Sequence, residues 1–105
     1  MRRGEVYEFR APKGTGHEQR GKRLGVVVQA DELLPRSTVL VAPTSTSARA
    51  ASFRPEIELG RQRTRVLVEH IASVDVSRLG KRVRQLEPQE QWAVDDALAT
   101  VLGLR

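Results

Sequence analysis

Residues 24–29 read LGVVVQ, a short and continuous apolar run that predicts a buried β-strand. On its N-terminal side, residues 4–10 alternate Glu with apolar side chains and predict a first strand. The segment between them, residues 11–23, holds three glycines and one proline and predicts a long loop. Further strands are predicted at 38–42, where Pro43 ends the strand, at 53–59 after a polar loop over 44–52, over 65–76 as one bent strand or two short ones, and at 81–86.

Only the C-terminal end of the chain shows helical periodicity. Pro88 suits the first position of a helix, and Gly103 predicts its end. Between them, apolar residues recur at the spacing of one buried helix face: Val94, Ala97, Leu98, Val101 and Leu102. Trp92 lies near the opposite face, as a packing residue or as part of a contact with a partner. About six short strands and one helix favour a small, strongly bent barrel, so we predict a mainly β fold with a C-terminal helix and one domain over residues 1–105.

The composition excludes several classes of protein. The 105 residues contain no cysteine, which rules out disulfides, thiolate catalysis and cysteine-ligated metal sites. No apolar run approaches the ~20 residues that a membrane span requires. No apolar stretch follows the arginines at the start of the chain, as it would in a signal peptide. We therefore expect a cytoplasmic protein that does not bind membranes.

The charge is positive and unevenly distributed. Eighteen Lys and Arg against thirteen Asp and Glu give a net charge of +5, and fifteen of the eighteen bases are arginine. Bases outnumber acids in residues 1–25, 49–65 and 78–84, whereas residues 87–96 contain four acids and no base. Because arginine forms forked contacts with phosphate, this balance favours a polyanionic partner. A well-solvated basic surface without a nucleic-acid ligand is the alternative.

Residues 17–23, HEQRGKR, form the best candidate for a site. An imidazole, a carboxylate and three bases lie within seven residues, directly before the buried strand. The sequence contains no HExxH motif, no carboxylate-rich metal loop and no Walker A phosphate loop. The chemistry must therefore rest on His, Asp, Glu, Arg, Lys, Ser and Thr.

Five segments of the sequence together match the pattern of one known family. They are residues 3–7 (RGEVY), 16–28 (GHEQRGKRLGVVV), 41–44 (VAPT), 68–75 (VEHIASVD) and the apolar helix end at 98–104. This pattern resembles the MazF/Kid (PemK-like) family of toxin–antitoxin endoribonucleases, and the similarity runs nearly end to end. The E-Q-x-G-x-R motif of residues 18–23 is its most specific part.

The resemblance implies an SH3-like or CcdB-like small barrel that works as a homodimer. Members of this family that resemble the chain cut single-stranded RNA at short sequences, without a metal or other cofactor. The ribose 2′-OH attacks its own phosphate, leaving a 2′,3′-cyclic phosphate and a 5′-OH. The implied partners are single-stranded RNA, either messenger, ribosomal or transfer RNA, and a cognate MazE-like antitoxin with an acidic C-terminal tail.

The resemblance also assigns roles to particular residues. The loop arginine of the family falls on Arg23, as phosphate stabiliser and proton shuttle, and its threonine falls on Thr44, with His17 assisting. The expected RNA-binding residues are Glu18, Gln19, Lys22, Ser45, Glu69 and His70.

Departures from the family pattern leave alternatives open. Leu24 replaces the usual proline, Leu67 stands where one branch has arginine, and His70 stands where many members have glutamine. Proton transfer is thus centred either on Arg23 or on His17 with Glu69. Two other functions stay open: a non-catalytic, CcdB-type toxin that binds DNA gyrase, and a barrel that binds RNA without cutting it.

Overall fold

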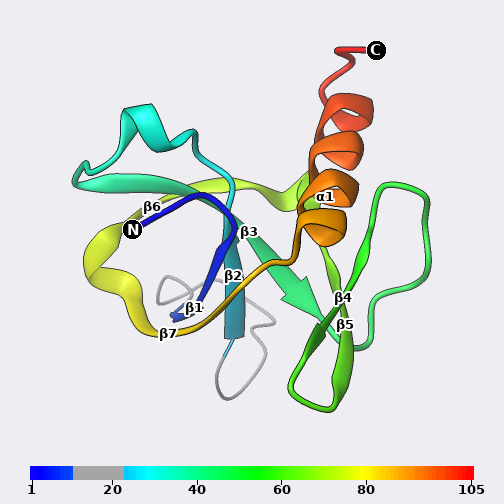
Figure 1. Cartoon of the computed structure of the whole chain (residues 1–105), viewed down its shortest axis with the longest axis horizontal. Helices are drawn as coiled ribbons and strands as arrows, with labels where there is room; N and C mark the ends of the chain where they lie inside the picture. The colour runs from blue at the N-terminus through cyan, green and yellow to red at the C-terminus, as the bar shows by residue number, and fades with distance from the viewer. Residues whose placement is uncertain (11–22) are drawn as a thin grey trace.

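The computed structural model describes residues 1–10 and 23–105. Within these ranges it has seven β-strands, three single-turn 3₁₀ helices and one α-helix. In chain order the elements are β1 (Glu5–Phe9), β2 (Arg23–Val27), η1 (Asp31–Leu33), β3 (Thr38–Ser45), β4 (Glu56–Leu59), β5 (Gln62–Val66), η2 (Val68–His70), β6 (Ala72–Asp75), η3 (Val76–Arg78), β7 (Leu79–Gln85) and α1 (Pro88–Val101) (Figure 1). The predicted mainly β fold with a C-terminal helix is confirmed.

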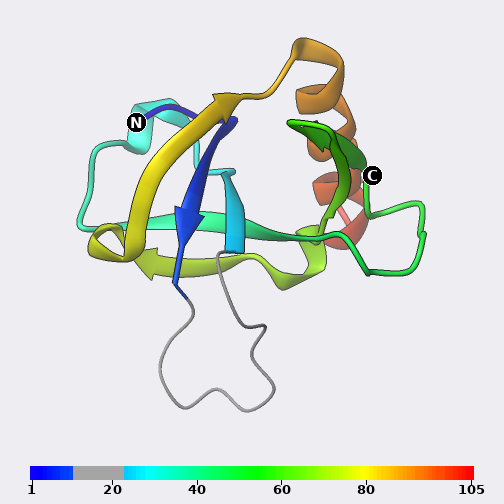
Figure 2. The ribbon, with the colours of Figure 1, turned by 90° about the horizontal axis from the view of Figure 1, so that it is seen from below.

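The strands form one curled antiparallel sheet in the order β4-β5-β3-β2-β1-β7, and β6 also pairs with β3. The eight-residue strand β3 is the centre of this arrangement. One of its edges pairs with β2, whereas the other edge pairs with β6 over Thr38–Val41 and then with β5 at Thr44 and Ser45. Figure 2 shows the result: β1 and β7 lie at one end of the curl, and the β4–β5 hairpin lies at the other, beside α1.

The predicted end of the third strand at Pro43 is wrong, because β3 continues to Ser45. The carbonyl of Pro43 accepts a hydrogen bond of 2.8 Å from the Leu67 amide, on the edge that faces β5 and β6. The proline nitrogen points to the same edge, since the N–H and C=O of one strand residue share a side. Pro43 lies where that edge changes partner from β6 to β5, so its missing N–H breaks no ladder hydrogen bond.

Other predicted boundaries also shift. Residues 53–55 precede β4 as a turn, in which the Arg54 amide donates to the Ala51 carbonyl at 3.0 Å. The region 65–76 forms two strands, β5 and β6, separated by η2. The last strand, β7, begins two residues earlier than predicted, at Leu79.

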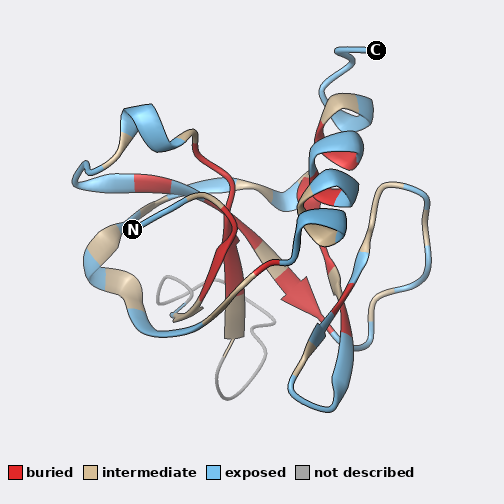
Figure 3. Cartoon of the chain, in the orientation of Figure 1, coloured by how far each residue is buried: buried red, intermediate tan, exposed pale blue. Residues whose placement is uncertain are grey.

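The buried apolar residues, coloured red in Figure 3, belong to two apolar clusters. The larger cluster joins β1, β2, β3, β5 and η2 to α1, and its fully buried valines are Val6, Val26, Val66, Val68 and Val94. The smaller cluster, on the opposite face, is Val27, Val39 and Val41, covered by Tyr7, Leu34, Val74, Val76 and Leu79. Successive residues of the two central strands, Val26 and Val27 of β2 and Val41 and Ala42 of β3, therefore alternate between two apolar clusters, whereas the outer strands β4 and β7 are largely exposed on one side.

The helix begins at Pro88, as predicted, with a reciprocal capping box between Glu87 and Glu90. Val94, Ala97 and Leu98 are buried, but the predicted stripe ends there: Leu102 is 54% exposed. Trp92 is 73% exposed, which places it on the outer face of the helix. In the described part of the chain, no helix is both long enough and apolar enough to span a membrane.

Candidate functional site

Arg23 is the first residue of β2 and lies at the end of the sheet from which residues 11–22 depart. It pairs directly with Phe9 of β1. Directly opposite residues of a sheet present their side chains on the same face. Gly25, two residues further along β2, lies on the same face, and a β-carbon built there would meet Phe9 and Val41. Val41 belongs to the smaller apolar cluster, so Arg23 lies on the face of that cluster.

Thr44 and Ser45 end the neighbouring strand β3 but face opposite ways. Thr44 pairs with Val66, which belongs to the larger cluster, and its hydroxyl donates a hydrogen bond of 3.0 Å to the Leu24 carbonyl. Ser45, one residue further, alternates to the face of Arg23. Ser45 Oγ lies 3.3 Å from Ser47 Oγ and accepts a hydrogen bond from the Ser47 amide at 3.3 Å. The structure therefore places Arg23 and Ser45, rather than Arg23 and Thr44, on one face.

Glu69 and His70 approach β3 from its other edge, in η2. Glu69 Oε2 accepts a hydrogen bond of 2.7 Å from Arg54 Nε and lies 2.6 Å from Arg54 Nη2 in the same ion pair. His70 Nε2 lies 3.8 Å from the same oxygen, and the His70 side chain is 59% exposed. Burial raises the pKa of Glu69, but the Arg54 hydrogen bond, a backbone hydrogen bond and the charges of Arg54 and His70 outweigh it and hold that pKa below its usual value. Glu69 is thus ionised at neutral pH and bound to Arg54.

Four of the predicted site residues, His17, Glu18, Gln19 and Lys22, lie outside the described residues. Their proposed roles therefore stay predictions. Among the residues that the structure describes, no group of three His, Asp or Glu side chains lies close enough together to hold a metal ion.

Sequence reasoning missed two arginines that lie next to the site. Arg54 and Arg65 both donate to carbonyls of the segment that follows Ser45, and each forms an ion pair with a glutamate, Glu69 or Glu56. A signal was present in the sequence, because Glu56 and Glu58 mirror Arg65 and Arg63 about the midpoint between Gly60 and Arg61. This mirror pattern is typical of cross-strand charge pairs in a hairpin, and the β4–β5 register shows both pairs opposite each other.

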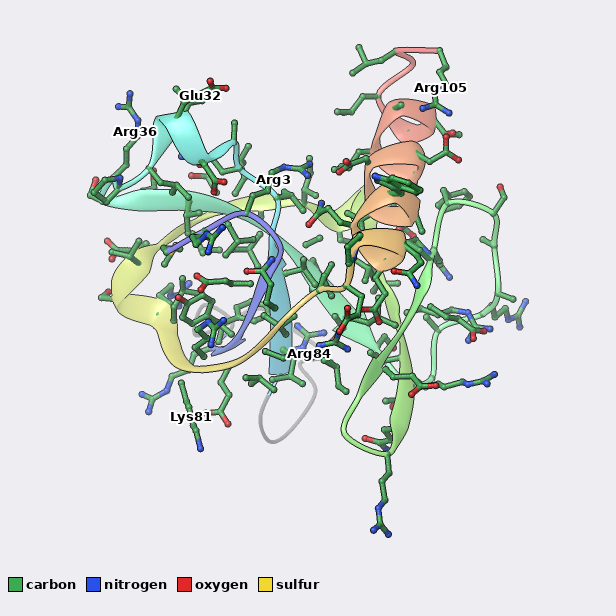
Figure 4. The ribbon with its side chains drawn as sticks, in the orientation of Figure 1. Arg3, Glu32, Arg36, Lys81, Arg84 and Arg105 are labelled. Carbon is green, nitrogen blue, oxygen red and sulfur yellow. The ribbon has the colours of Figure 1, made fainter. Side chains whose placement is uncertain are left out.

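The basic strand β7 lies on the far side of β1 and extends the positive surface. Lys81 projects outward from this strand (Figure 4). Arg82 is half-exposed and donates from Nε to the buried Glu5 at 2.6 Å. Arg84 points inward instead, and its guanidinium binds Glu90 at the start of α1 at 2.6 Å (Figure 4). The strand thus combines solvent-facing cations with one that fixes the helix.

Guanidinium and hydroxyl groups on one face of the sheet form an arrangement that can bind a phosphate group. A guanidinium donates paired hydrogen bonds to phosphate oxygens, and a hydroxyl adds a weaker one. The same donors stabilise a transition state in which negative charge accumulates on the phosphate oxygens. The surroundings of Arg23 can therefore bind a phosphodiester and stabilise its reaction.

Comparison with known proteins identifies the family of the chain. Residues 2–102 match the family described as the PemK-like, MazF-like toxin of type II toxin–antitoxin system. The chain is also 43% identical over 105 residues, covering 97% of each protein, to the Mycobacterium tuberculosis (strain ATCC 25618 / H37Rv) protein named "Putative toxin Rv3098A/RVBD_3098A".

Solved structures share the fold at lower sequence identity. One is an endoribonuclease in complex with its cognate antitoxin from Mycobacterial species, with a TM-score of 0.82, 20% identity, and coverage of 100% of this chain and 97% of that chain. Another is MazF from Deinococcus radiodurans, with a TM-score of 0.79, 22% identity, and coverage of 98% and 96%. These likenesses support the fold, and the sequence match gives the family. The chain therefore belongs to the PemK-like, MazF-like toxins of type II toxin–antitoxin systems.

Proposed function

We propose that this toxin is an endoribonuclease that cuts single-stranded RNA at short sequences without a metal ion. Membership of the MazF-like toxins supports this activity, as does a structural relative that is named an endoribonuclease. The observation that carries the proposal is that Arg23 and a strand-end hydroxyl lie on one face of the sheet, where β2 begins and β3 ends.

The proposed reaction uses the nucleophile of the substrate itself. The ribose 2′-oxygen loses its proton and attacks the adjacent phosphorus, and the bond from phosphorus to the 5′-oxygen breaks. The 5′-oxygen takes up a proton, so the products are a 2′,3′-cyclic phosphate and a 5′-OH. Such a reaction needs a proton acceptor, a proton donor and cations on the phosphate oxygens, but no nucleophile from the protein. It therefore suits a chain without cysteine.

In this scheme Arg23 binds the phosphate oxygens and stabilises the charge that develops on them. Thr44 was the hydroxyl expected from the sequence, but its proton is directed to the Leu24 carbonyl. Ser45 is better oriented to bind a phosphate oxygen, because it shares the face of Arg23. His17 assists the proton transfers, and Glu18, Gln19, Lys22 and His70 contribute RNA contacts.

We further propose that the toxin acts as a homodimer and is neutralised by a cognate antitoxin with an acidic C-terminal tail. Three of the structural relatives carry names with two partners: an endoribonuclease in complex with its cognate antitoxin from Mycobacterial species, and two forms of MazE-MazF from Deinococcus radiodurans. The net charge of +5 favours an acidic ligand.

A cleavage assay tests the activity. Wild-type protein is incubated with a mixed-sequence single-stranded RNA, with and without EDTA, and the product ends are identified by mass spectrometry. We expect cleavage in both conditions and cyclic phosphate ends. Arg23→Ala should lower the rate on the order of 10²–10³-fold, the usual cost of losing one preorganised donor. Arg36→Ala is the matched control, because this exposed arginine lies at the outer edge of the fold (Figure 4).

Other outcomes assign other functions. RNA binding without cleavage would indicate a non-cutting RNA-binding barrel, whereas neither binding nor cleavage would favour a CcdB-type toxin that acts on DNA gyrase. Unchanged cleavage by the Arg23→Ala protein would contradict the proposed mechanism.

A further inference from the structure

The β3–β4 loop, residues 46–55, follows Ser45 directly and is bound from two sides. Arg65 Nη1 donates to the Ala48 carbonyl at 3.3 Å, and Arg54 Nη1 donates to the Arg49 carbonyl at 3.1 Å. Two guanidinium groups thus bind consecutive carbonyls of one surface loop. Loops generally satisfy such groups with water, so this loop is held in place to an unusual degree.

Each of these arginines also forms an ion pair with a glutamate. Arg54 binds Glu69 Oε2 at 2.6 Å, and Arg65 binds Glu56 Oε1 at 2.8 Å. The side chains of Arg54 and Glu69 are only 24% and 22% exposed, so water and salt screen this pair weakly. Arg54 also lies over the Phe53 ring, 5.6 Å from its centroid, and Phe53 packs on the larger apolar cluster.

The acidic partner of Arg54 is fixed to the sheet. Glu69 lies between Val68, which is fully buried, and His70, in the short helix η2. That helix follows Leu67, whose amide donates to the Pro43 carbonyl of β3 at 2.8 Å. The Arg54–Glu69 pair therefore connects the loop to the strand that carries Ser45.

Glu69 is not presented to a substrate in this arrangement. Its Oε2 accepts a hydrogen bond from Arg54 Nε and forms an ion pair with Arg54 Nη2, and its Oε1 is buried without a hydrogen-bond partner in the part of the chain that the structure describes. A general acid or base must reach the proton that it transfers. The geometry favours a role in which Glu69 acts through Arg54.

We propose that Arg54 and Glu69 are a positioning pair, which holds the β3–β4 loop beside the strand-end site and thereby determines which nucleotides are accepted next to the scissile phosphate. The proposal rests on the ribonuclease function proposed above. Thr46, Ser47 and Arg49 are exposed on the loop and begin one residue after Ser45, so they can contact nucleotides that flank the phosphate. Selective contacts need groups held in place before the ligand binds.

Two linked measurements test the pair. Hydrogen exchange of the full-length protein reports the order of residues 46–55 without RNA. Cleavage of a random-sequence RNA pool, with kcat and KM on one preferred sequence, reports selection. The variants are Arg54→Met, Glu69→Gln and the double variant. Arg63→Met and Glu58→Gln are the matched controls, because this hairpin pair is 3.9 Å apart, with side chains 76% and 68% exposed.

We expect faster exchange in residues 46–55 for Arg54→Met and Glu69→Gln, and no change for the controls. KM should account for most of a fall in kcat/KM on the order of 10–10²-fold, since misplaced contacts can cost that much. The sequence preference should broaden, and the double variant should be no worse than either single one, because the two residues act as a unit.

Unchanged exchange in this loop would overturn the proposal. So would a loss confined to kcat with an altered pH profile for Glu69→Gln, which would make Glu69 an acid or base. A wild-type protein that cuts no RNA refutes the ribonuclease function, and with it the selection of nucleotides. In that case, hydrogen exchange of residues 46–55 still shows whether Arg54 and Glu69 hold the β3–β4 loop in place.

Discussion

The hydroxyl of Thr44 donates a hydrogen bond of 3.0 Å to the backbone carbonyl of Leu24, which joins the end of β3 to the start of β2. Thr44 is 7% exposed and pairs with the buried Val66. Its hydroxyl therefore satisfies a backbone acceptor beside Arg23 and keeps two strand ends together. The neighbouring hydroxyl of Ser45 has a different environment, on the opposite face.

We expect Thr44→Val and Ser45→Ala to have different consequences. Thr44→Val leaves the Leu24 carbonyl without its donor, which should destabilise the fold by about 1–3 kcal/mol. Ser45 is also buried, but the hydrogen bonds between its hydroxyl and Ser47 are longer, at 3.3 Å, so Ser45→Ala should lower the melting temperature less than Thr44→Val does. It should nevertheless lower RNA cleavage at least about tenfold, because it removes a donor to the phosphate. Thermal unfolding and single-turnover cleavage of both variants measure this difference.

Thr44→Ser is the control, since it keeps the hydroxyl and should retain most of the stability. If Thr44→Val instead abolishes cleavage at an unchanged melting temperature, Thr44 is the hydroxyl that binds the phosphate, as the family resemblance first suggested.

Glu5 should make the stability of the protein depend on acid pH. Its carboxylate is 8% exposed and accepts hydrogen bonds from the Arg2 amide, the Tyr7 hydroxyl and the Arg82 guanidinium, at 2.7, 3.0 and 2.6 Å. Burial raises the pKa of Glu5, but these three hydrogen bonds and the charge of Arg82 together hold it below the ordinary 4.5. The ionised form is therefore favoured by folding.

A group whose pKa is lowered on folding contributes stability above its unfolded pKa and loses it as the pH falls through the folded pKa. Glu5→Gln should thus lower the free energy of unfolding by about 1–3 kcal/mol at pH 7, and by progressively less below about pH 4.5. Urea unfolding from pH 7 to pH 3 measures the effect. Glu32→Gln, an exposed change in η1, should show no such pH dependence. If Glu5→Gln lowers the free energy of unfolding by the same amount at every pH, the ionised Glu5 carboxylate is not the source of the stability.

Gly25 is required because the two strands beside it approach closely. A β-carbon built there would collide with Val41 Cγ1 and come within 3.1 Å of Phe9 Cδ1. Val41 is 2% exposed and belongs to the smaller apolar cluster, so its movement would disturb buried neighbours. Gly25→Ala should therefore destabilise the protein by about 1–3 kcal/mol, the usual cost of overpacking a core.

Gly80→Ala is the matched control for this prediction. Its β-carbon would meet nothing closer than 3.5 Å, so thermal unfolding should show little change. Equal melting temperatures for the two alanine variants would show that the sheet relaxes around Gly25.

The sequence was most informative where one periodicity dominated. Pro88 and the apolar stripe predicted the helix start and its buried face, and the run at 24–29 predicted a buried strand, in agreement with α1 and β2. The stripe could not show that the sheet ends before the last helical turn, which leaves Leu102 exposed. The predicted end of β3 was wrong because the effect of a proline depends on which edge of the strand its nitrogen faces.

The sequence predicted which residue types form the candidate site, but not on which face of the sheet their side chains lie. The motif pointed to Arg23 and to a threonine at the end of a strand, yet a shift of one residue moves a side chain to the other face. Only the register of β1, β2 and β3 shows that Ser45 shares the face of Arg23. The mirrored charges of β4 and β5 indicate the Arg65–Glu56 pair, but no local pattern indicates that Arg65 contacts Ala48, 17 residues away, or that Arg54 contacts Glu69, 15 residues away.

The identity of the acid and base can be decided with His17→Ala. If Arg23 carries the proton transfer, this variant should lose little activity, and the wild-type rate should change little between pH 6 and 7, the range of an unperturbed imidazole with a pKa of about 6.5. If His17 is the acid or base, His17→Ala should lower the cleavage rate about as much as Arg23→Ala does. The pH dependence of the wild-type rate in this range should then disappear in the His17→Ala variant. Single-turnover rates across pH 5–9, for wild type and both variants, separate the two schemes. His70→Ala is the control, because His70 lies on the other edge of β3 and should keep the wild-type pH profile.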